Sequence, residues 1–186
     1  MPDRRVKSAL NAMQPRHAVL TGAPGAGKTT LLGAAAAAGY RTSPEVARQL
    51  LQSPGGMELR TNDPLGFAEA MAQAHAREFE LHAAAPRTVI FDRGLPDVVG
   101  FLDVSGLAVP KAVDHACRTL RYAGPVLRAP AWAEIYVQDA ERIQTLEQAI
   151  ASDEAVTAAW QRYGYAVTDL PLASLAERLA FLKAQL

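Results

Sequence analysis

The strongest indication of the fold is the segment Gly22-Ala23-Pro24-Gly25-Ala26-Gly27-Lys28-Thr29. This stretch fits G-x-x-x-x-G-K-[ST], the pattern of a phosphate-binding loop, or P-loop. The short apolar segment 18–20 precedes it, and good helix formers follow it as far as Ala38. The motif therefore stands between a predicted strand and a predicted helix, which is the structural context that it requires.

The residue types in this loop suit the binding of a polyphosphate. Glycines lack a Cβ, so the backbone can curl until its N–H groups point inward and form an anion cradle at the helix N-terminus. Lys28 can place its ammonium group on the β- and γ-phosphates, and the hydroxyl of Thr29 can ligate Mg²⁺. We therefore expect ATP and Mg²⁺ as cofactors. The expected nucleotide-binding residues are Gly22, Ala23, Pro24, Gly25, Ala26, Gly27, Lys28, Thr29 and Thr30.

Length and composition are those of one globular domain. The chain has 186 residues, of which 49% are apolar and 20% are charged. Lys and Arg together number 19, as do Asp and Glu, so no basic excess favours a nucleic acid polymer or a membrane surface as a partner. No apolar run is long enough to span a bilayer, and the single cysteine, Cys117, excludes a disulfide framework within the chain. We expect a cytoplasmic protein, and its oligomeric state, monomer or dimer, stays open.

Strands and helices are expected to alternate along the chain. Residues 1–15 lack periodicity and predict a flexible tail, while residues 16–186 predict a single domain. Expected strands lie at about residues 17–20, 40–43, 88–91, 125–129 and 165–168, with 134–137 as a rival for the fourth. Expected helices lie at about residues 28–38, 45–52, 63–85, 96–104, 109–122, 144–163 and 175–186, and a mobile loop at 53–63. This alternation predicts an α/β fold whose parallel sheet is covered by helices on both faces.

An acid and an arginine follow one of these predicted strands, and ligands of such sheets bind beyond the carboxyl ends of the strands. Asp92 ends the apolar run 88–91 and fits a Walker B acid, which would hold Mg²⁺ directly or through water. Arg93, next to it, can clamp a phosphate or a substrate oxygen in bidentate fashion. The alternative for this pair is a strand-end turn with a surface ion pair.

Glu45 follows the second predicted strand, so it should face the γ-phosphate from the acceptor side. A carboxylate there can take a proton from an acceptor hydroxyl, and phosphoryl transfer needs that proton removed or oriented. The alternative is an ordinary first-turn glutamate that the helix dipole stabilises. On the functional interpretation, Lys28, Glu45 and Asp92 converge on one crevice.

Weaker candidates for an acceptor pocket lie further along the chain. They are Arg48, Phe67, Gln73 and Arg77. Phe67 could stack on an acceptor and Gln73 could pair with a base or amide edge, although ordinary helix surface or core is the alternative for each. His75 and His82 lie seven residues apart on one helical face, and we interpret both as structural because metal sites usually need three or four convergent ligands.

Several segments resemble the small AAA-type P-loop domain of the NadR nicotinamide-riboside-kinase group, which is related to deoxynucleoside and thymidylate kinases. The segments that carry the resemblance include residues 22–30, Pro44-Glu45-Val46-Ala47-Arg48, Phe91-Asp92-Arg93-Gly94-Leu95-Pro96-Asp97 and Asp139-Ala140-Glu141-Arg142. The resemblance covers most of the chain from about His17. It implies a P-loop NTPase fold, a three-layer α/β/α sandwich whose five-stranded parallel sheet has the kinase-type strand order 2-3-1-4-5.

The resemblance also implies roles for single residues. Glu45 would be the base and Arg93 a clamp on the substrate side, with Lys28 and Asp92 serving the phosphates and the metal. Arg142 would close on the phosphates from a lid at about residues 131–147. Kinases of the deoxynucleoside type often carry several arginines in this lid, whereas this stretch offers Arg142 alone.

Two functions from different classes fit these observations. The first is a kinase that transfers the γ-phosphoryl group of ATP to a hydroxyl of a nucleoside-like or nucleotide-like small molecule. The second is a regulatory ATPase or nucleotide-binding switch, with residues 53–63 and 131–142 as switch surfaces. An acceptor pocket between Glu45, Arg93 and the helix at 63–85 would favour the kinase. The chain contains no Asn-Lys-x-Asp, so the usual guanine readout of GTPases is missing.

Overall fold

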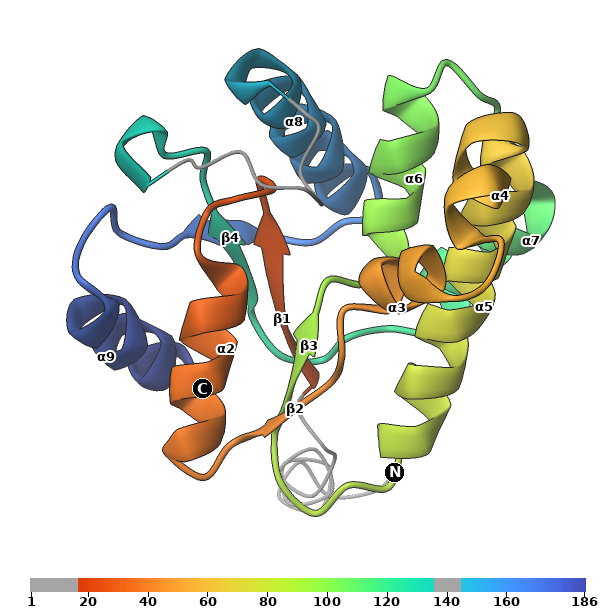
Figure 1. Ribbon diagram of the computed structural model, residues 1–186. Helices are drawn as coiled ribbons and strands as arrows, with labels where there is room; N and C mark the ends of the chain where they lie inside the picture. The colour runs from red at the N-terminus through yellow and green to blue at the C-terminus, as the bar shows by residue number, and fades with distance from the viewer. Residues whose placement is uncertain (1–16, 136–144) are drawn as a thin grey trace.

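The computed structural model describes residues 17–135 and 145–186, and it contains a five-stranded sheet in which all neighbouring strands run parallel (Figure 1). The strands are β1 His17–Gly22, β2 Arg41–Thr42, β3 Val89–Asp92, β4 Val126–Ala129 and β5 Val167–Asp169. Their order is β2-β3-β1-β4-β5, which confirms the predicted order and the choice of residues 125–129 as the fourth strand. β1 lies between β3 and β4, so the loop that follows it sits over the middle of the sheet edge.

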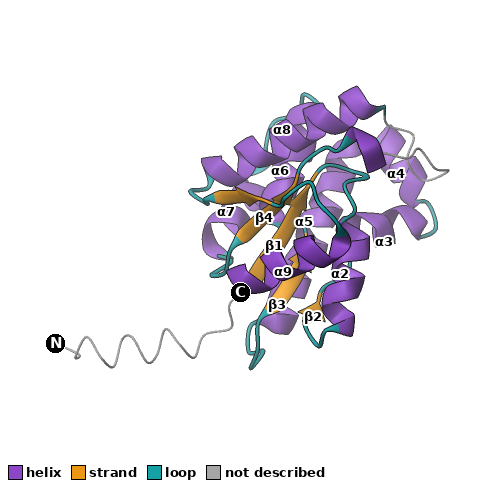
Figure 2. Ribbon diagram, turned by 90° about the vertical axis from the view of Figure 1, so that its left-hand side faces the viewer, coloured by secondary structure: helices purple, strands orange, loops and turns teal. Residues whose placement is uncertain are grey.

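Helices cover both faces of the sheet, as Figure 2 shows from the side. They are α2 Lys28–Ala37, α3 Val46–Gln52, α4 Gly56–Asn62, α5 Pro64–His82, α6 Leu95–Val104, α7 Lys111–Thr119, α8 Leu146–Arg162 and α9 Leu175–Gln185, with a short 3-10 helix at Ala133–Ile135. α2 and α9 lie on one face, and α5, α6 and α8 lie on the other (Figure 1). This confirms the predicted α/β/α layers. None of the helices in the described part of the chain is both long and apolar enough to cross a membrane.

Neighbouring residues of β1 belong to separate hydrophobic clusters, because successive side chains of a strand point to opposite faces of the sheet. Leu20 packs with Leu31 of α2 and Leu182 of α9. Val19 packs on the other face with Trp160 of α8. All five residues are 0% exposed, so β1 is buried on both faces, as a central parallel strand should be.

One expectation about the chain is wrong, since residues 53–63 do not form a loop throughout. α4 occupies Gly56–Asn62, and Gly55 begins it from a left-handed conformation with a φ of 76°. Leu59 of this helix packs against the hydrophobic cluster that α5 and α6 form. α4 could not be predicted from the sequence, because this helix begins at two glycines and is too short to show an apolar period.

Other boundaries differ from the expected ones by a few residues. α5 begins at the predicted cap, where a carboxylate oxygen of Asp63 accepts from the N–H of Gly66 at 2.9 Å. It ends at His82 instead of near residue 85. The last strand runs over Val167–Asp169 instead of 165–168.

α6 and α8 approach each other closely at Gly100. A Cβ at this position would lie 2.6 Å from the Cα of Val156 on α8, which is closer than real Cβ atoms approach. The glycine is therefore required by packing. This contact helps to fix α6, the helix that follows directly from Asp92 and Arg93.

We expect Gly100→Ala to destabilise the fold by about 1–3 kcal/mol, because overpacking outweighs a gain of about 1 kcal/mol in helix propensity. Gly33→Ala in α2 is the matched control. Apart from its own helix, no described atom lies within 4 Å of the added Cβ, so this change should stabilise the protein by up to about 1 kcal/mol. Urea unfolding measures both changes. A Gly100→Ala variant as stable as the wild type would contradict the close approach.

Candidate functional site

The P-loop passes from β1 to α2 directly beside the end of β4. Gly22 has a φ of 115°, and a Cβ on it would overlap the carbonyl group of Ala129. The N–H of Ala23 donates to that same carbonyl at 3.0 Å. The loop is therefore tied to the sheet at a point where only glycine fits.

Most residues that were expected to bind nucleotide line one large cleft. These are Pro24, Gly25, Gly27, Lys28, Thr29 and Thr30. The remaining three, Gly22, Ala23 and Ala26, lie beneath the lining, and the two alanines are fully or almost fully buried. The loop thus lines the cleft from Pro24 onward, apart from Ala26, and it is bonded to the sheet through Ala23.

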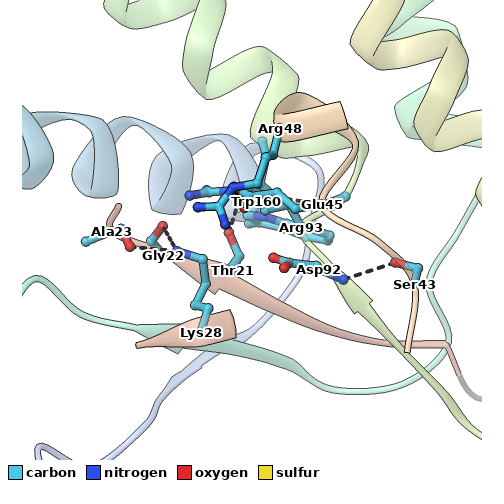
Figure 3. A network of polar contacts seen from close by, with 12 residues as sticks. Thr21, Gly22, Ala23, Lys28, Ser43, Glu45, Arg48, Asp92, Arg93 and Trp160 are labelled. Atoms are coloured by element: carbon cyan, nitrogen blue, oxygen red, sulfur yellow. Dashed lines mark hydrogen bonds and ion pairs between the residues drawn. The ribbon is translucent and has the colours of Figure 1, made fainter. Parts of the chain in front are cut away.

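Lys28 lies inside the loop, as Figure 3 shows. The residue is 6% exposed, and its Nζ donates to the carbonyls of Gly22 at 3.1 Å and Ala23 at 2.6 Å. Burial, aided by the like charge of Arg93, lowers the pKa of Lys28 to about 7. An anionic phosphate in the loop would stabilise the charged form of this ammonium group.

Glu45, Arg93 and Asp97 form a chain of ion pairs just beyond the ends of β2 and β3, where Glu45 and Arg93 lie side by side (Figure 3). The Nε of Arg93 lies 3.4 Å from Oε1 of Glu45, and its Nη1 donates to Oδ1 of Asp97 at 3.0 Å. On the other side of Glu45, the Nε of Arg48 lies 3.5 Å from Oε2. The structure therefore brings the expected base and the expected clamp into direct contact.

These charges set the ionisation of Glu45. Burial works to raise the pKa of Glu45, but the positive charges of Arg93, Lys28 and Arg48 outweigh burial and lower it. Burial works to lower the pKa of Arg93, but the neighbouring carboxylates, above all Asp97, raise it instead. Glu45 is therefore a carboxylate at neutral pH, which is the form that can accept a proton.

Arg93 is held in a strained backbone conformation. Its φ of 67° is positive, and no other non-glycine residue in the described part of the chain shares this. Its N–H donates to the carbonyl of Leu20 at 3.0 Å, which extends the pairing of β3 with β1 by one residue. Strain of this kind costs about 1–3 kcal/mol and persists where the surroundings enforce it, most often at functional sites.

Asp97 is a residue of this site that sequence reasoning missed. Its Oδ1 also accepts from the hydroxyl of Thr21 at 2.6 Å. Its Oδ2 accepts from the N–H of Gly94 at 3.0 Å and from Nε1 of Trp160 at 2.9 Å. Asp97 thus orients Arg93 from a position that β1 and α8 fix. The available signal was the spacing of Arg93 and Asp97, which are four residues apart at a helix start.

Asp92 ends β3 beside the P-loop, and its carboxylate suits a metal ion. The residue is 4% exposed, its N–H donates to the hydroxyl of Ser43 at 3.1 Å, and its Oδ1 is buried with no hydrogen-bond partner among the described residues. Burial, together with the negative charge of Glu45, raises the pKa of Asp92 to about 6. Thr29 and Asp92 both line the same small hollow beside the cleft.

The carboxylate of Asp92 and the hydroxyl of Thr29 offer the oxygen ligands that Mg²⁺ prefers, and the site therefore fits this ion. Within residues 17–135 and 145–186, no group of three or more His, Cys, Asp or Glu side chains is placed to hold a metal by itself. Phosphate oxygens and water would have to complete the coordination, which is the usual manner of binding for Mg²⁺ at a nucleotide.

The cleft encloses about 1070 Å³ and has two parts. The first is lined by the P-loop, by Trp132 and Ile135, and by Ser174, Leu175 and Arg178 at the start of α9. The second is lined by residues of α3 to α6, including Leu51, Met57, Phe67, Met71, His75, Val98 and Phe101. Sites for one small molecule commonly enclose about 300–1,000 Å³, so this cleft has room for a nucleotide and a second molecule.

The weaker candidates on α5 fall into two groups. Phe67 is buried and lines the cleft, whereas Gln73 and Arg77 are exposed and do not line it. His75, which we interpreted as structural, also lines the cleft. It is 3% exposed, it makes no hydrogen bond to any described residue, and burial lowers its pKa to about 4, so the imidazole is neutral at pH 7. The four-residue spacing of Phe67, Met71 and His75 could have revealed this face from the sequence.

The remaining candidates have different positions. Arg48 lines the cleft. The ring of His82 instead lies 3.7 Å from the carboxylate of Glu78 on its own helix. Arg142 lies outside the described residues, as does most of the expected lid, so its role stays a prediction. Arg178, which follows Ala26 by 152 residues, donates to the carbonyl of Ala26 in the P-loop. It was not among the predicted site residues, although it lies in a segment that shares the family resemblance.

Comparison with known structures agrees with this geometry. A deoxyadenosine kinase from M. mycoides with the products dCMP and dCDP bound superposes with a TM-score of 0.69 at 14% identity, over 90% of this chain and 97% of that one. A thymidylate kinase from Candida albicans gives a TM-score of 0.63 at 9% identity, over 92% of this chain and 90% of that one. At such identities the likeness shows a shared fold. A search of the curated proteins found no match.

The family assignment comes from the sequence itself. Residues 17–178 match the family model described as an AAA domain, which spans the segment from the start of β1 to Arg178 in α9. The P-loop and the Glu45, Asp92 and Arg93 side chains all fall inside this span. The chain therefore belongs to the AAA domain family, with a P-loop fold that it shares with deoxynucleoside and thymidylate kinases.

Proposed function

We propose that this protein is a small-molecule kinase, which transfers the γ-phosphoryl group of ATP to a hydroxyl of a nucleoside-like or nucleotide-like acceptor. One observation carries the proposal. A single cleft of about 1070 Å³ contains the P-loop at one end and, in contact with Arg93, the ionised carboxylate of Glu45. A proton acceptor of this kind, beside a cation and facing space for a second molecule, is what phosphoryl transfer to a hydroxyl requires.

In this reaction the acceptor oxygen attacks the γ-phosphorus of ATP. A new P–O bond forms while the bond from phosphorus to the β,γ-bridging oxygen breaks, and ADP leaves with that electron pair. The hydroxyl proton passes to the carboxylate of Glu45. Arg93 stabilises the negative charge on the transferring group, and its two bonds to carboxylates keep it aimed at the cleft.

Lys28 would bind the phosphate chain from within the loop once phosphate oxygens replace its bonds to the carbonyls of Gly22 and Ala23. Thr29 and Asp92 would hold Mg²⁺, which supplies charge neutralisation between the phosphates when it is bound. The protein's part of the chemistry is then mostly positioning and electrostatics, for which buried, mutually paired charges are well suited.

The second part of the cleft favours a kinase over a nucleotide-binding switch. A switch needs no enclosed space beyond the γ-phosphate, whereas α3 to α6 line a mostly apolar space next to Glu45 and Arg93. The fold likeness to a deoxyadenosine kinase and a thymidylate kinase supports a nucleoside or nucleotide as acceptor. Nicotinamide riboside also belongs in the acceptor screen, because several sequence segments resemble the nicotinamide-riboside-kinase group. The comparisons do not name that group, so this acceptor stays a prediction.

We expect Glu45→Gln to bind ATP as the wild type does but to lower phosphoryl transfer on the order of a hundredfold or more, because the amide cannot accept the proton. Transfer from labelled ATP is measured across a panel of nucleosides, nucleotides and nicotinamide riboside. Glu58→Gln, at an exposed glutamate of α4, is the matched control and should leave transfer unchanged. Full turnover by Glu45→Gln would rule this residue out as the base.

We expect Lys28→Ala to weaken ATP binding by about tenfold or more, since the variant loses charge-assisted hydrogen bonds to the phosphates. Titration calorimetry with ATP and Mg²⁺ measures the change. Lys183→Ala, at an exposed position of α9, serves as the control for loss of a lysine. Equal affinity of Lys28→Ala and the wild type would mean that the loop does not hold the phosphates through this residue.

We expect His75→Leu to raise the acceptor KM by about tenfold while the KM for ATP stays constant. The buried, neutral imidazole has no hydrogen-bond partner among the described residues, so a polar group of the acceptor is its natural partner, and such a bond discriminates strongly between acceptors. Met71→Leu, on the same face of α5, keeps the lining apolar and should alter the acceptor KM far less. If both variants behave alike, His75 only fills space.

A further inference from the structure

Arg178 joins the C-terminal helix to the middle of the P-loop. It lies in the first turn of α9, whose start is fixed by a capping box between Ser174 and Glu177. The residue is 5% exposed, and its Nη2 donates to the carbonyl of Ala26 at 2.9 Å. The guanidinium also stands against Gly27, because a Cβ there would lie 2.9 Å from Nη1. Arg178 thus contacts the loop at the peptide that joins these two residues.

The contact with Arg178 fixes the direction of the N–H group of Gly27. The carbonyl of Ala26 and the N–H of Gly27 belong to the same planar, trans peptide unit, so they point in opposite directions. A bond that turns the carbonyl toward α9 therefore turns the N–H of Gly27 away from α9. Within the described part of the chain this N–H donates to no acceptor, and Gly27 lines the cleft. The group is free for an anion in the loop.

The charge of Arg178 also favours a bound anion. No carboxylate lies within ion-pair distance of it among the described residues, and its Nε is buried without a partner. The neighbouring Glu177 bonds to Ser174 instead. Burial, with no opposing charge, lowers the pKa of Arg178. Its guanidinium also lies over the ring of Trp132, whose centroid is 6.0 Å from Cζ. A buried cation with no carboxylate partner in the wall of a cleft is still costly, and a bound anion would offset that cost.

We propose that Arg178 is a positioning residue for nucleotide binding: through the carbonyl of Ala26 it aims the N–H of Gly27 at the phosphate chain of ATP, and its charge draws that chain into the loop. The inference rests on the ATP-binding half of the proposed function and needs no particular acceptor. It gives α9, which lies beside α2 in Figure 1, a part in the site besides that of covering the sheet.

The test compares Arg178→Met with Arg178→Lys, which keeps a charged donor, and uses Lys183→Met on the exposed face of α9 as the matched control. Calorimetry gives the affinity for ATP with Mg²⁺, and thermal unfolding gives the midpoint with and without ATP. The amide proton of Gly27, observed by NMR, reports the direction of this one group.

We expect Arg178→Met to bind ATP about tenfold or more weakly and to lose most of the ATP-induced rise in unfolding midpoint. Its midpoint without ATP should stay within about 2 °C of the wild type, because the variant removes a buried cation that has no carboxylate partner along with a hydrogen bond. Arg178→Lys should recover most of the affinity. The Gly27 amide proton should move on ATP addition in the wild type and much less in Arg178→Met.

Three outcomes would overturn the inference. Wild-type affinity in Arg178→Met would show that the N–H needs no positioning. A large fall in the midpoint without ATP, or failure to fold, would make Arg178 a structural tie. Absence of ATP binding by the wild type would remove the nucleotide-binding half of the proposed function as well. In the first two cases the proposed kinase activity would still stand, so the two failures are distinguishable.

Discussion

The carboxylate of Asp97 is the interaction on which the site depends. It accepts hydrogen bonds from a β1 hydroxyl, from the indole of α8, from the first N–H beyond Arg93 and from the guanidinium of Arg93 itself. One buried group thereby connects the central strand, the end of β3 and the helix layer behind them. Removing it would leave several buried donors without partners, and each such donor costs about 1–3 kcal/mol. The position of Arg93 is therefore fixed by groups in the core of the fold.

Around Asp97, cations and carboxylates alternate within a few ångströms. Arg93 lies between two carboxylates, and Glu45 lies between two arginines. Each of these partly buried charges lies next to an opposite charge. The neighbouring cations lower the pKa of Glu45 and keep it ionised, which is the form that accepts a proton. The left-handed backbone at Arg93 adds strain at the same place. Together these features mark a functional site more clearly than any one of them does.

Much of the fold could be predicted from the sequence because its signals are local. The P-loop has a fixed pattern, and apolar strands alternate with helices, so the parallel sheet, its layers and the clustering of Glu45 and Arg93 follow. The missed features depend on contacts between distant segments or lack a period. α4 opens on two glycines, Arg178 meets the loop from 152 residues away, and Asp97 gains its importance from Thr21 and Trp160. No local pattern encodes such pairings.

The lining of the cleft has an evolutionary consequence under the proposed function. The loop after β1 and the start of α9 line the part that we assign to ATP, whereas α3 to α6 line the part that we assign to the acceptor. On this assignment, substitutions in α3 to α6 would change the acceptor without altering the residues that hold the phosphates. A lineage with this architecture would then modify a different compound while it keeps ATP as the donor.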